Sequence, residues 1–297
     1  MGKIVVINGR QLDSEQNFKN LCETFVLIKN EEYGDNAYWL DKNVIKTIFS
    51  ATKASEKSGI LARLTLIDSM YSTQMNRRYY ALEEIAQKLY DISQHSDLKT
   101  FFTDYAKNPN MTDDYGLFSA NYGIGKNCTT KGVAISLISK YAYFETDYQF
   151  PIYDSIAREM IPLVWKYCGW GKSPKLSVHK IGTVKIDGGD TIKNFVNTIN
   201  DTITRLGGNV SYDHLDRLLW FVGKIRRGNL SLLLSKADYI KCINAYNENA
   251  INKTGNAIFK RAASVSLKFF KVEKIFSNSL LSASKGAIVI KPENRRF

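Results

Sequence analysis

The sequence lacks any close pair of cysteines. Its four cysteines are spread along 297 residues, at Cys22, Cys128, Cys168 and Cys242. Zinc and iron–sulfur sites use clustered cysteine or histidine ligands, and the three histidines of this chain are scattered as well. We therefore expect no metal centre and no other cofactor, and we interpret the cysteines as free thiols in a reducing compartment.

Long apolar runs are absent too. No stretch approaches the length of a membrane span, and the apolar run in the N-terminal MGKIVVINGR is too short for an export signal. The chain also has no internal repeat, no low-complexity tract and no nucleotide-binding P-loop. These absences predict a cytoplasmic protein that does not enter membranes.

Negative charge is scarce relative to positive charge. Lys and Arg total 41 against 29 Asp and Glu, which gives a net charge of +12. Such an excess favours polyanionic partners, nucleic acid above all, because basic side chains neutralise phosphates and release counterions. Ribosomal proteins, membrane-surface proteins and ordinary basic proteins share this property, so charge alone leaves the partner open.

The spacing of apolar residues predicts a mainly α-helical chain. Leu61, Leu64, Ile67, Met70 and Tyr71 recur every three or four residues, as on one face of a helix. Further helices are predicted over residues 13–27, 44–54, 79–92, 155–167, 192–206 and 212–227. We expect a loop over residues 31–43 and minor strands near the two termini, the first over residues 3–8 and ending in the turn residues Asn8 and Gly9. The length fits a single unit over residues 1–297, undivided or in two lobes.

The helix predicted over residues 212–227 begins with several charged side chains. Asp213 and Asp216 lie near its start, where carboxylates are favourable at the positive end of a helix. We interpret them as helix-stabilising residues, and an acid–base role for His214 together with an aspartate is the less favoured alternative.

Residues 131–160, KGVAISLISKYAYFETDYQFPIYDSIAREM, contain the most informative pattern. It starts beside Gly132, continues as an apolar helix and ends in FPIYDS at residues 150–155. Proline disfavours the helical region for Phe150, and Asp154 or Ser155 is suited to cap the next helix. The pattern predicts two helices joined by an extended link, with an aspartate at the start of the second.

These residues resemble the helix-hairpin-helix DNA glycosylase superfamily, in particular its prokaryotic oxoguanine-glycosylase-like branch. The similarity lies in three features: Gly132 followed by Val133, the pair Ser139 and Lys140, and the segment PIYDS at residues 151–155. It extends more loosely to residues 67–74. It implies a two-lobed helical fold with a hairpin and catalytic core over residues 120–170. It also implies that hairpin N–H groups approach a phosphate of double-stranded DNA, that the aspartate assists glycosidic cleavage, and that a lysine, where present, attacks the sugar.

The resemblance assigns Asp154 as catalytic and leaves the nucleophile open. Counted from Gly132, the lysine position of the family falls on Ser136, and a serine there resembles the monofunctional adenine-excising branch, which uses water. Lys140 lies four residues later, so on a continuous helix it shares the face of Ser136. Lys140 is our candidate nucleophile, or else a phosphate contact, and Ser136 and Lys131 are alternates.

Two segments are predicted to contact DNA. In the hairpin these are Gly132, Ala134 and Ser139; Ala134 replaces the second glycine of the family pattern, and it keeps its N–H but restricts the turn. The polar segment STQMNRR at residues 72–78 corresponds to one that faces the lesion in oxoguanine-type enzymes. Its candidate DNA contacts are Gln74, Arg77 and Arg78. A solvated turn between two helices is an equal alternative for this segment.

The sequence thus favours a monomeric DNA glycosylase that flips a damaged or modified base out of duplex DNA and cleaves its N-glycosidic bond. Asp154 would stabilise positive charge developing on the sugar and orient water or the Lys140 amine. Oxoguanine and a phage-type modified base are both compatible, so repair and antiviral defence remain alternatives. The rival hypotheses are a non-catalytic DNA-binding protein that retains the hairpin and a basic structural or RNA-associated protein.

Overall fold

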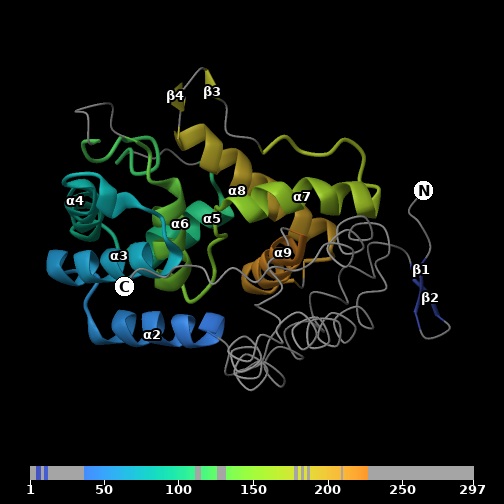
Figure 1. The fold of residues 1–297 in the computed structure, drawn as a ribbon, viewed down its shortest axis with the longest axis horizontal. Helices are drawn as coiled ribbons and strands as arrows, with labels where there is room; N and C mark the ends of the chain where they lie inside the picture. The colour runs from blue at the N-terminus through green and yellow to red at the C-terminus, as the bar shows by residue number, and fades with distance from the viewer. Residues whose placement is uncertain are drawn as a thin grey trace, which may run out of the picture.

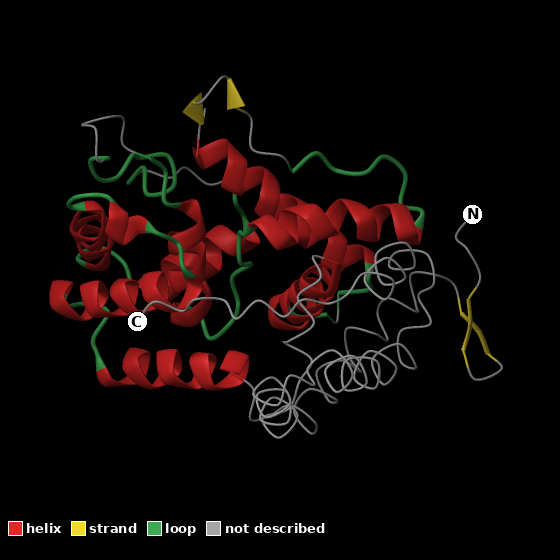
Figure 2. Cartoon of the chain, in the orientation of Figure 1, coloured by secondary structure: helices red, strands yellow, loops and turns green. Residues whose placement is uncertain are grey.

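The computed structural model describes residues 5–7, 10–12, 37–110, 115–125, 132–176, 180–181, 184–185, 188–208 and 210–226. This part of the chain is mainly α-helical, as predicted (Figures 1 and 2). Its helices are α2 (Ala37–Ala51), α3 (Lys57–Tyr71), α4 (Ala81–Ser93), α5 (Leu98–Lys107), α6 (Ile135–Glu145), α7 (Ser155–Cys168), α8 (Gly188–Arg205) and α9 (Tyr212–Arg226), with a 3₁₀ turn, η1, at Met75–Arg77. The predicted helix over residues 13–27 and the C-terminal strand lie outside the described residues.

Two short antiparallel hairpins accompany the helices. The strands β1 (Val5–Ile7) and β2 (Arg10–Leu12) pair with each other, which confirms the strand predicted before Asn8 and Gly9. The strands β3 (Lys180–Ile181) and β4 (Val184–Lys185) also pair with each other; they lie between α7 and α8, where no strand was predicted. The loop expected over residues 31–43 was also wrong from Ala37 onward, because α2 begins there.

Helix α6 lies at the centre of the described helices, with α2, α3 and α4 to one side and α7, α8 and α9 to the other (Figure 1). It packs against α2, α3 and α5, and nearly all of its side chains are buried. Its sequence ISLISKYAYFE is apolar around most of the helix, as expected of a helix enclosed by others. The first helix of the motif of residues 131–160 therefore lies in the core.

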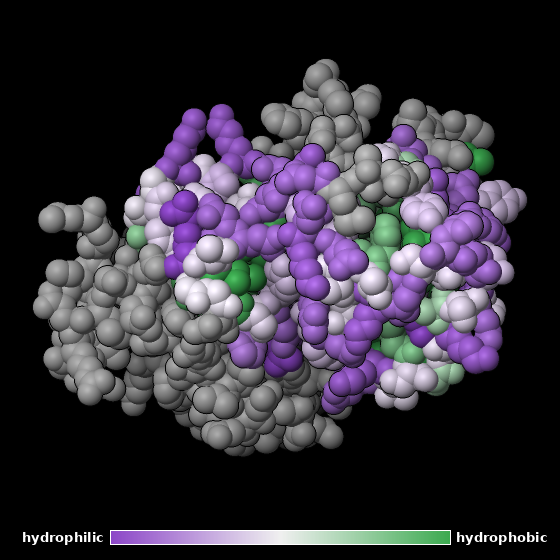
Figure 3. Space-filling model, turned by 180° about the vertical axis from the view of Figure 1, so that it is seen from behind, coloured by the Kyte–Doolittle hydropathy of each residue, from purple (hydrophilic) through white to green (hydrophobic). Residues whose placement is uncertain are grey.

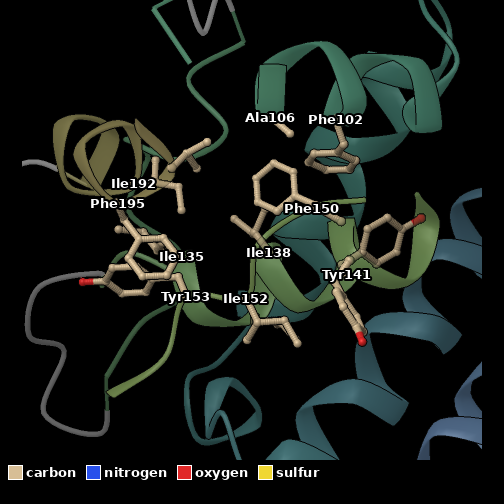
Figure 4. Close-up of a cluster of buried hydrophobic side chains, with 14 of the residues drawn as sticks. Phe102, Ala106, Ile135, Ile138, Tyr141, Phe150, Ile152, Tyr153, Ile192 and Phe195 are labelled. Carbon is tan, nitrogen blue, oxygen red and sulfur yellow. The ribbon is translucent and has the colours of Figure 1, made fainter. Parts of the chain in front are cut away.

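The link between α6 and α7 is anchored by Phe150. Its ring is fully buried and stacks on Phe118 at a centroid distance of 6.2 Å. It also meets Phe102 of α5 edge-on at 5.8 Å, and Figure 4 shows it beside Phe102 and Ile138. Burial of a phenylalanine contributes roughly 1.5–3 kcal/mol, so this ring fixes where the link runs.

The surface of the described part is largely hydrophilic where Figure 3 shows it, with hydrophobic residues visible only in small gaps. Within the described ranges, none of the helices combines the length and the apolar character needed to cross a bilayer.

Candidate active site

The link presents Asp154 at the first turn of α7. The Tyr153 N–H donates to Ser139 Oγ of α6 at 3.0 Å, and the Tyr153 ring meets Phe195 of α8 edge-on at 5.1 Å. Immediately afterwards the Asp154 carboxylate accepts a hydrogen bond from the Ala157 N–H at 2.7 Å. The predicted cap is therefore confirmed, and the carboxylate is held in one orientation.

Lys140 projects from α6 into the interior, and its residue surface is only 4% exposed. Its Nζ donates to Ser136 Oγ at 2.7 Å and to Ser136 O at 3.3 Å, so the two side chains share one face of α6 as predicted. The Nζ also lies 5.5 Å from the centroid of the Tyr71 ring. Lys140 and Ser136, the two nucleophile candidates that the structure describes, are thus in direct contact. The third candidate, Lys131, lies outside the described residues.

The charge state of Lys140 is set by its surroundings. Burial lowers the pKa of the Lys140 amine below its ordinary value, because an ammonium loses hydration there. The carboxylates of Asp154 and then Asp216 oppose this shift. Lys140 and Asp154 therefore interact electrostatically although 14 residues separate them, and the interaction includes a third residue, from α9.

A buried polar network fixes α9 against α6 and α2. The Asp213 carboxylate accepts from Lys42 Nζ at 3.1 Å and from the hydroxyl of Tyr143, and Arg217 binds both of its oxygens at 2.7 and 2.6 Å. Burial alone would raise the pKa of Asp213, but Lys42 and Arg217 hold it below its ordinary value. This network determines the register between α6 and α9.

The position of Asp216 depends on that register. It lies one turn after Asp213 on α9, and Lys140 lies one turn before Tyr143 on α6, so each is adjacent to the Tyr143–Asp213 contact. The Asp216 side chain is partly buried and interacts electrostatically with Asp154. The sequence does not connect Asp216 with Asp154, because no local spacing links it to residues 131–160.

The polar segment at residues 72–78 is held in shape by Asp68 of α3. Its carboxylate accepts from the Met75 N–H at 2.8 Å, from the Asn76 N–H at 3.1 Å and from the Thr73 hydroxyl. Gln74 has a left-handed backbone, with φ of 63°, and its side-chain oxygen accepts from Arg77 at 3.3 Å. The segment is therefore a fixed exposed turn.

Residues 122–124 connect this turn with the hairpin glycine, Gly132. Tyr79 and Ile124 exchange backbone hydrogen bonds of 3.0 Å, and Tyr122 pairs in the same way with Gly132 at 3.0 and 3.3 Å. Gly132 leaves room for Arg78, since a Cβ there would lie 2.5 Å from the guanidinium. Gln74, Arg77, Arg78 and Gly132, predicted separately from the sequence, thus belong to one region.

The remaining two predicted DNA contacts are interior. Ala134 is 3% exposed and forms the N-cap of α6 with φ of −108°, a backbone conformation that does not need glycine. Ser139 is fully buried, and its hydroxyl donates to Ser136 O at 3.2 Å while it accepts from Tyr153. In this arrangement Ser139 positions the link that carries Asp154.

Gly132→Ala is expected to displace the Arg78 guanidinium while leaving the core intact, because the clash involves the end of a flexible side chain. If Arg78 contacts a DNA phosphate, duplex affinity should fall roughly tenfold at low salt, and the salt dependence of binding should become shallower. Fluorescence anisotropy with a labelled duplex at several salt concentrations measures both. Unchanged affinity together with an unchanged salt slope would contradict a role for this contact.

Comparison with protein-family models, curated proteins and solved structures finds no match for this chain. Within the residues that the structure describes, no group of three or more His, Cys, Asp or Glu side chains is arranged to hold a metal ion. The candidate site therefore consists of the buried Lys140 amine and the helix-capping Asp154 carboxylate.

Proposed function

We propose that this protein is a DNA glycosylase that excises a damaged or modified base from duplex DNA. The observation that carries the proposal is a buried lysine amine on α6 that interacts with a helix-capping aspartate at the start of α7. An amine can attack the sugar carbon, and a carboxylate can stabilise the positive charge that develops as the glycosidic bond breaks. In this proposal Lys140 is the nucleophile and Asp154 the electrostatic partner.

The position of Lys140 suits a nucleophile in one respect. An amine attacks only when it is neutral, and an exposed lysine is almost fully protonated at neutral pH. Burial lowers the pKa of Lys140 and so increases the fraction of neutral amine. Asp154 acts in the opposite direction, which keeps the ammonium form accessible as well.

The same burial imposes a requirement on the proposal. Lys140 Nζ is engaged by Ser136 and lies next to the Tyr71 ring, so a sugar can reach it only if these contacts open. The hydrogen bond to Ser136 is between neighbouring turns of one helix, so rotation of the lysine side chain breaks it without disturbing the backbone. We propose that binding of the extruded nucleotide drives this rotation.

The region around Gly132 provides a surface for the duplex. Arg77 is exposed beside Tyr79 and Tyr80, which are 62% and 66% exposed, and Ile124 is 38% exposed. Tyr80 is held with φ of 62°, an uncommon backbone conformation for a tyrosine. Exposed rings next to arginines suit DNA, because rings stack on unpaired bases while guanidinium groups bind phosphates.

Tyr80→Ala is expected to weaken binding to a duplex with one extrahelical or mismatched base by about 1–3 kcal/mol, the usual contribution of one base–aromatic stack. Binding to fully paired DNA should change less, since its bases are already stacked. Competition titrations with the two duplexes measure the difference. Equal losses on both duplexes would show that Tyr80 does not stack on an unpaired base.

The proposed function is tested by incubating the protein with duplexes that carry oxoguanine or other modified bases and then treating them with alkali. Excision leaves alkali-labile abasic sites on at least one modified duplex and none on the unmodified control. Tight, salt-sensitive duplex binding without abasic sites on any substrate would contradict the proposal. That result would favour a non-catalytic DNA-binding protein.

A further inference from the structure

A cavity of about 130 Å³ lies at the C-terminal end of α6. Its lining residues come from α2, α3, the last turn of α6 and the turn that follows α6. Lys140 and Asp154 do not line it, so it is separate from the candidate active site. Drug-sized ligands occupy roughly 300–1,000 Å³, and this smaller space therefore suits a molecule of only a few heavy atoms.

Three aromatic rings form the apolar wall of the cavity. Phe49 of α2 lies 5.7 Å from Phe144 of α6 between ring centroids, and Phe144 meets Tyr148 edge-on at 5.8 Å. The turn after α6 brings Tyr148 back toward α2 through two successive left-handed residues, Asp147 with φ of 50° and Tyr148 with φ of 72°. These rings offer apolar contact to an aliphatic group of a ligand.

A buried ion pair contributes a carboxylate to the same cavity. Glu145 Oε2 lies 2.6 Å from Arg63 Nη1, and both residues line the space. Arg63 also donates to Phe49 O and to both oxygens of Thr52, so little of its capacity is left for a ligand anion. The Glu145 carboxylate can accept further hydrogen bonds. It also lies in the last turn of α6, where the helix dipole favours positive charge, so this end of the cavity suits a cationic N–H donor.

Lys46 contributes an unpaired cation at the exposed rim of the cavity. It lies one turn before Phe49 on α2, and its Nζ is 5.9 Å from the centroid of the Tyr148 ring. Among the described residues no carboxylate pairs with Lys46, whereas Asp147, the other carboxylate of the lining, pairs with Lys99. Lys46 is therefore the cation of the cavity that is available to a ligand carboxylate.

We propose that this cavity binds a free α-amino acid with a small apolar side chain. The described lining includes two cations and two carboxylates, so it favours a ligand without net charge. A carboxylate at Lys46, an ammonium at Glu145 and an aliphatic body against the rings are the three groups that an α-amino acid carries on one carbon. A phosphate ligand would instead bring up to two negative charges to a cavity with one unpaired cation.

Isothermal titration calorimetry with L-leucine tests this site. L-leucine is expected to bind with a Kd of roughly 10 μM to 1 mM, a range that so few ligand atoms can supply. L-leucinamide lacks the carboxylate and N-acetyl-L-leucine lacks the ammonium, so each should bind at least about tenfold more weakly. Absence of binding at about 10 mM L-leucine, or equal affinity for the three compounds, would overturn the proposal.

Lys46→Met tests which residue holds the ligand carboxylate. Affinity for L-leucine should fall roughly tenfold, while affinity for L-leucinamide should not fall, because that compound has no carboxylate to lose. Lys46 is exposed, so the variant should fold normally. Lys53→Met is the matched control, because Lys53 is exposed, pairs with Glu56 and does not line the cavity; it should keep wild-type affinity for both compounds.

Unchanged L-leucine affinity in Lys46→Met, or an equal loss for both compounds, would overturn the proposal. None of these titrations includes DNA. Their outcome is therefore independent of the proposed function, and absence of base excision would leave this site unaffected.

Discussion

Asp154→Asn is expected to slow base excision by roughly 10²–10⁴-fold, the range typical of a positioned acid–base group. The variant should still fold, because asparagine caps a helix about as well as aspartate and can accept the hydrogen bond from the Ala157 N–H. It should also bind duplex DNA normally, since the exposed arginines and tyrosines lie elsewhere on the chain. Single-turnover kinetics and duplex titrations measure the two effects separately.

Asp97→Asn provides a matched control for this variant. Asp97 is the N-cap of α5, and its carboxylate accepts from the Thr100 N–H at 2.9 Å, so the substitution makes the same chemical change at another helix start. Excision by Asp97→Asn should equal that of the wild type. If both variants lose activity to the same extent, the effect comes from helix capping and the catalytic role of Asp154 is wrong.

Arg63→Met is expected to destabilise the protein by about 3–5 kcal/mol, as is typical when one partner of a buried ion pair is removed. The Arg63 and Glu145 side chains are 5% and 10% exposed and lie 2.6 Å apart. Arg63 also donates to Phe49 O and to the Thr52 hydroxyl, each at 2.8 Å. Methionine would fill the space but leave the Glu145 carboxylate and these oxygens without their donor. Urea unfolding measures the loss.

Lys53→Met is the corresponding control on the surface. Lys53 pairs with Glu56 at 3.0 Å, but the two side chains are 75% and 53% exposed, so water replaces the interaction when it is lost. The free energy of unfolding should change by less than about 0.5 kcal/mol. Similar effects of the two substitutions would show that the Arg63–Glu145 pair does not stabilise the core as described.

Local patterns in the sequence were sufficient to predict much of this architecture. The apolar repeat from Leu61 to Tyr71 is helix α3, and the Pro151 link followed by Asp154 does end in a capped helix. The helix predicted over residues 155–167 is α7, which ends at Gly169 with φ of 72°. These features depend on interactions within a few residues, which a sequence displays directly.

The rest of the candidate site depends on contacts between distant residues. Lys42 and Asp213 are 171 positions apart, and nothing in either neighbourhood indicates that they pair. The electrostatic interaction between Asp216 of α9 and Asp154 of α7 also joins residues that are far apart in the sequence. The antiparallel contact between Tyr122 and Gly132 places the hairpin glycine beside Arg78. The spacing of apolar residues does not indicate this contact either.

The central claim is that Lys140 attacks the sugar while Asp154 stabilises the developing charge. Borohydride trapping on duplexes with oxoguanine or other modified bases, followed by mass spectrometry of the peptide bound to DNA, tests it most directly. The account predicts a covalent adduct on Lys140 that disappears in Lys140→Gln. Abasic sites without any adduct, or an adduct on another lysine such as Lys131, would contradict it.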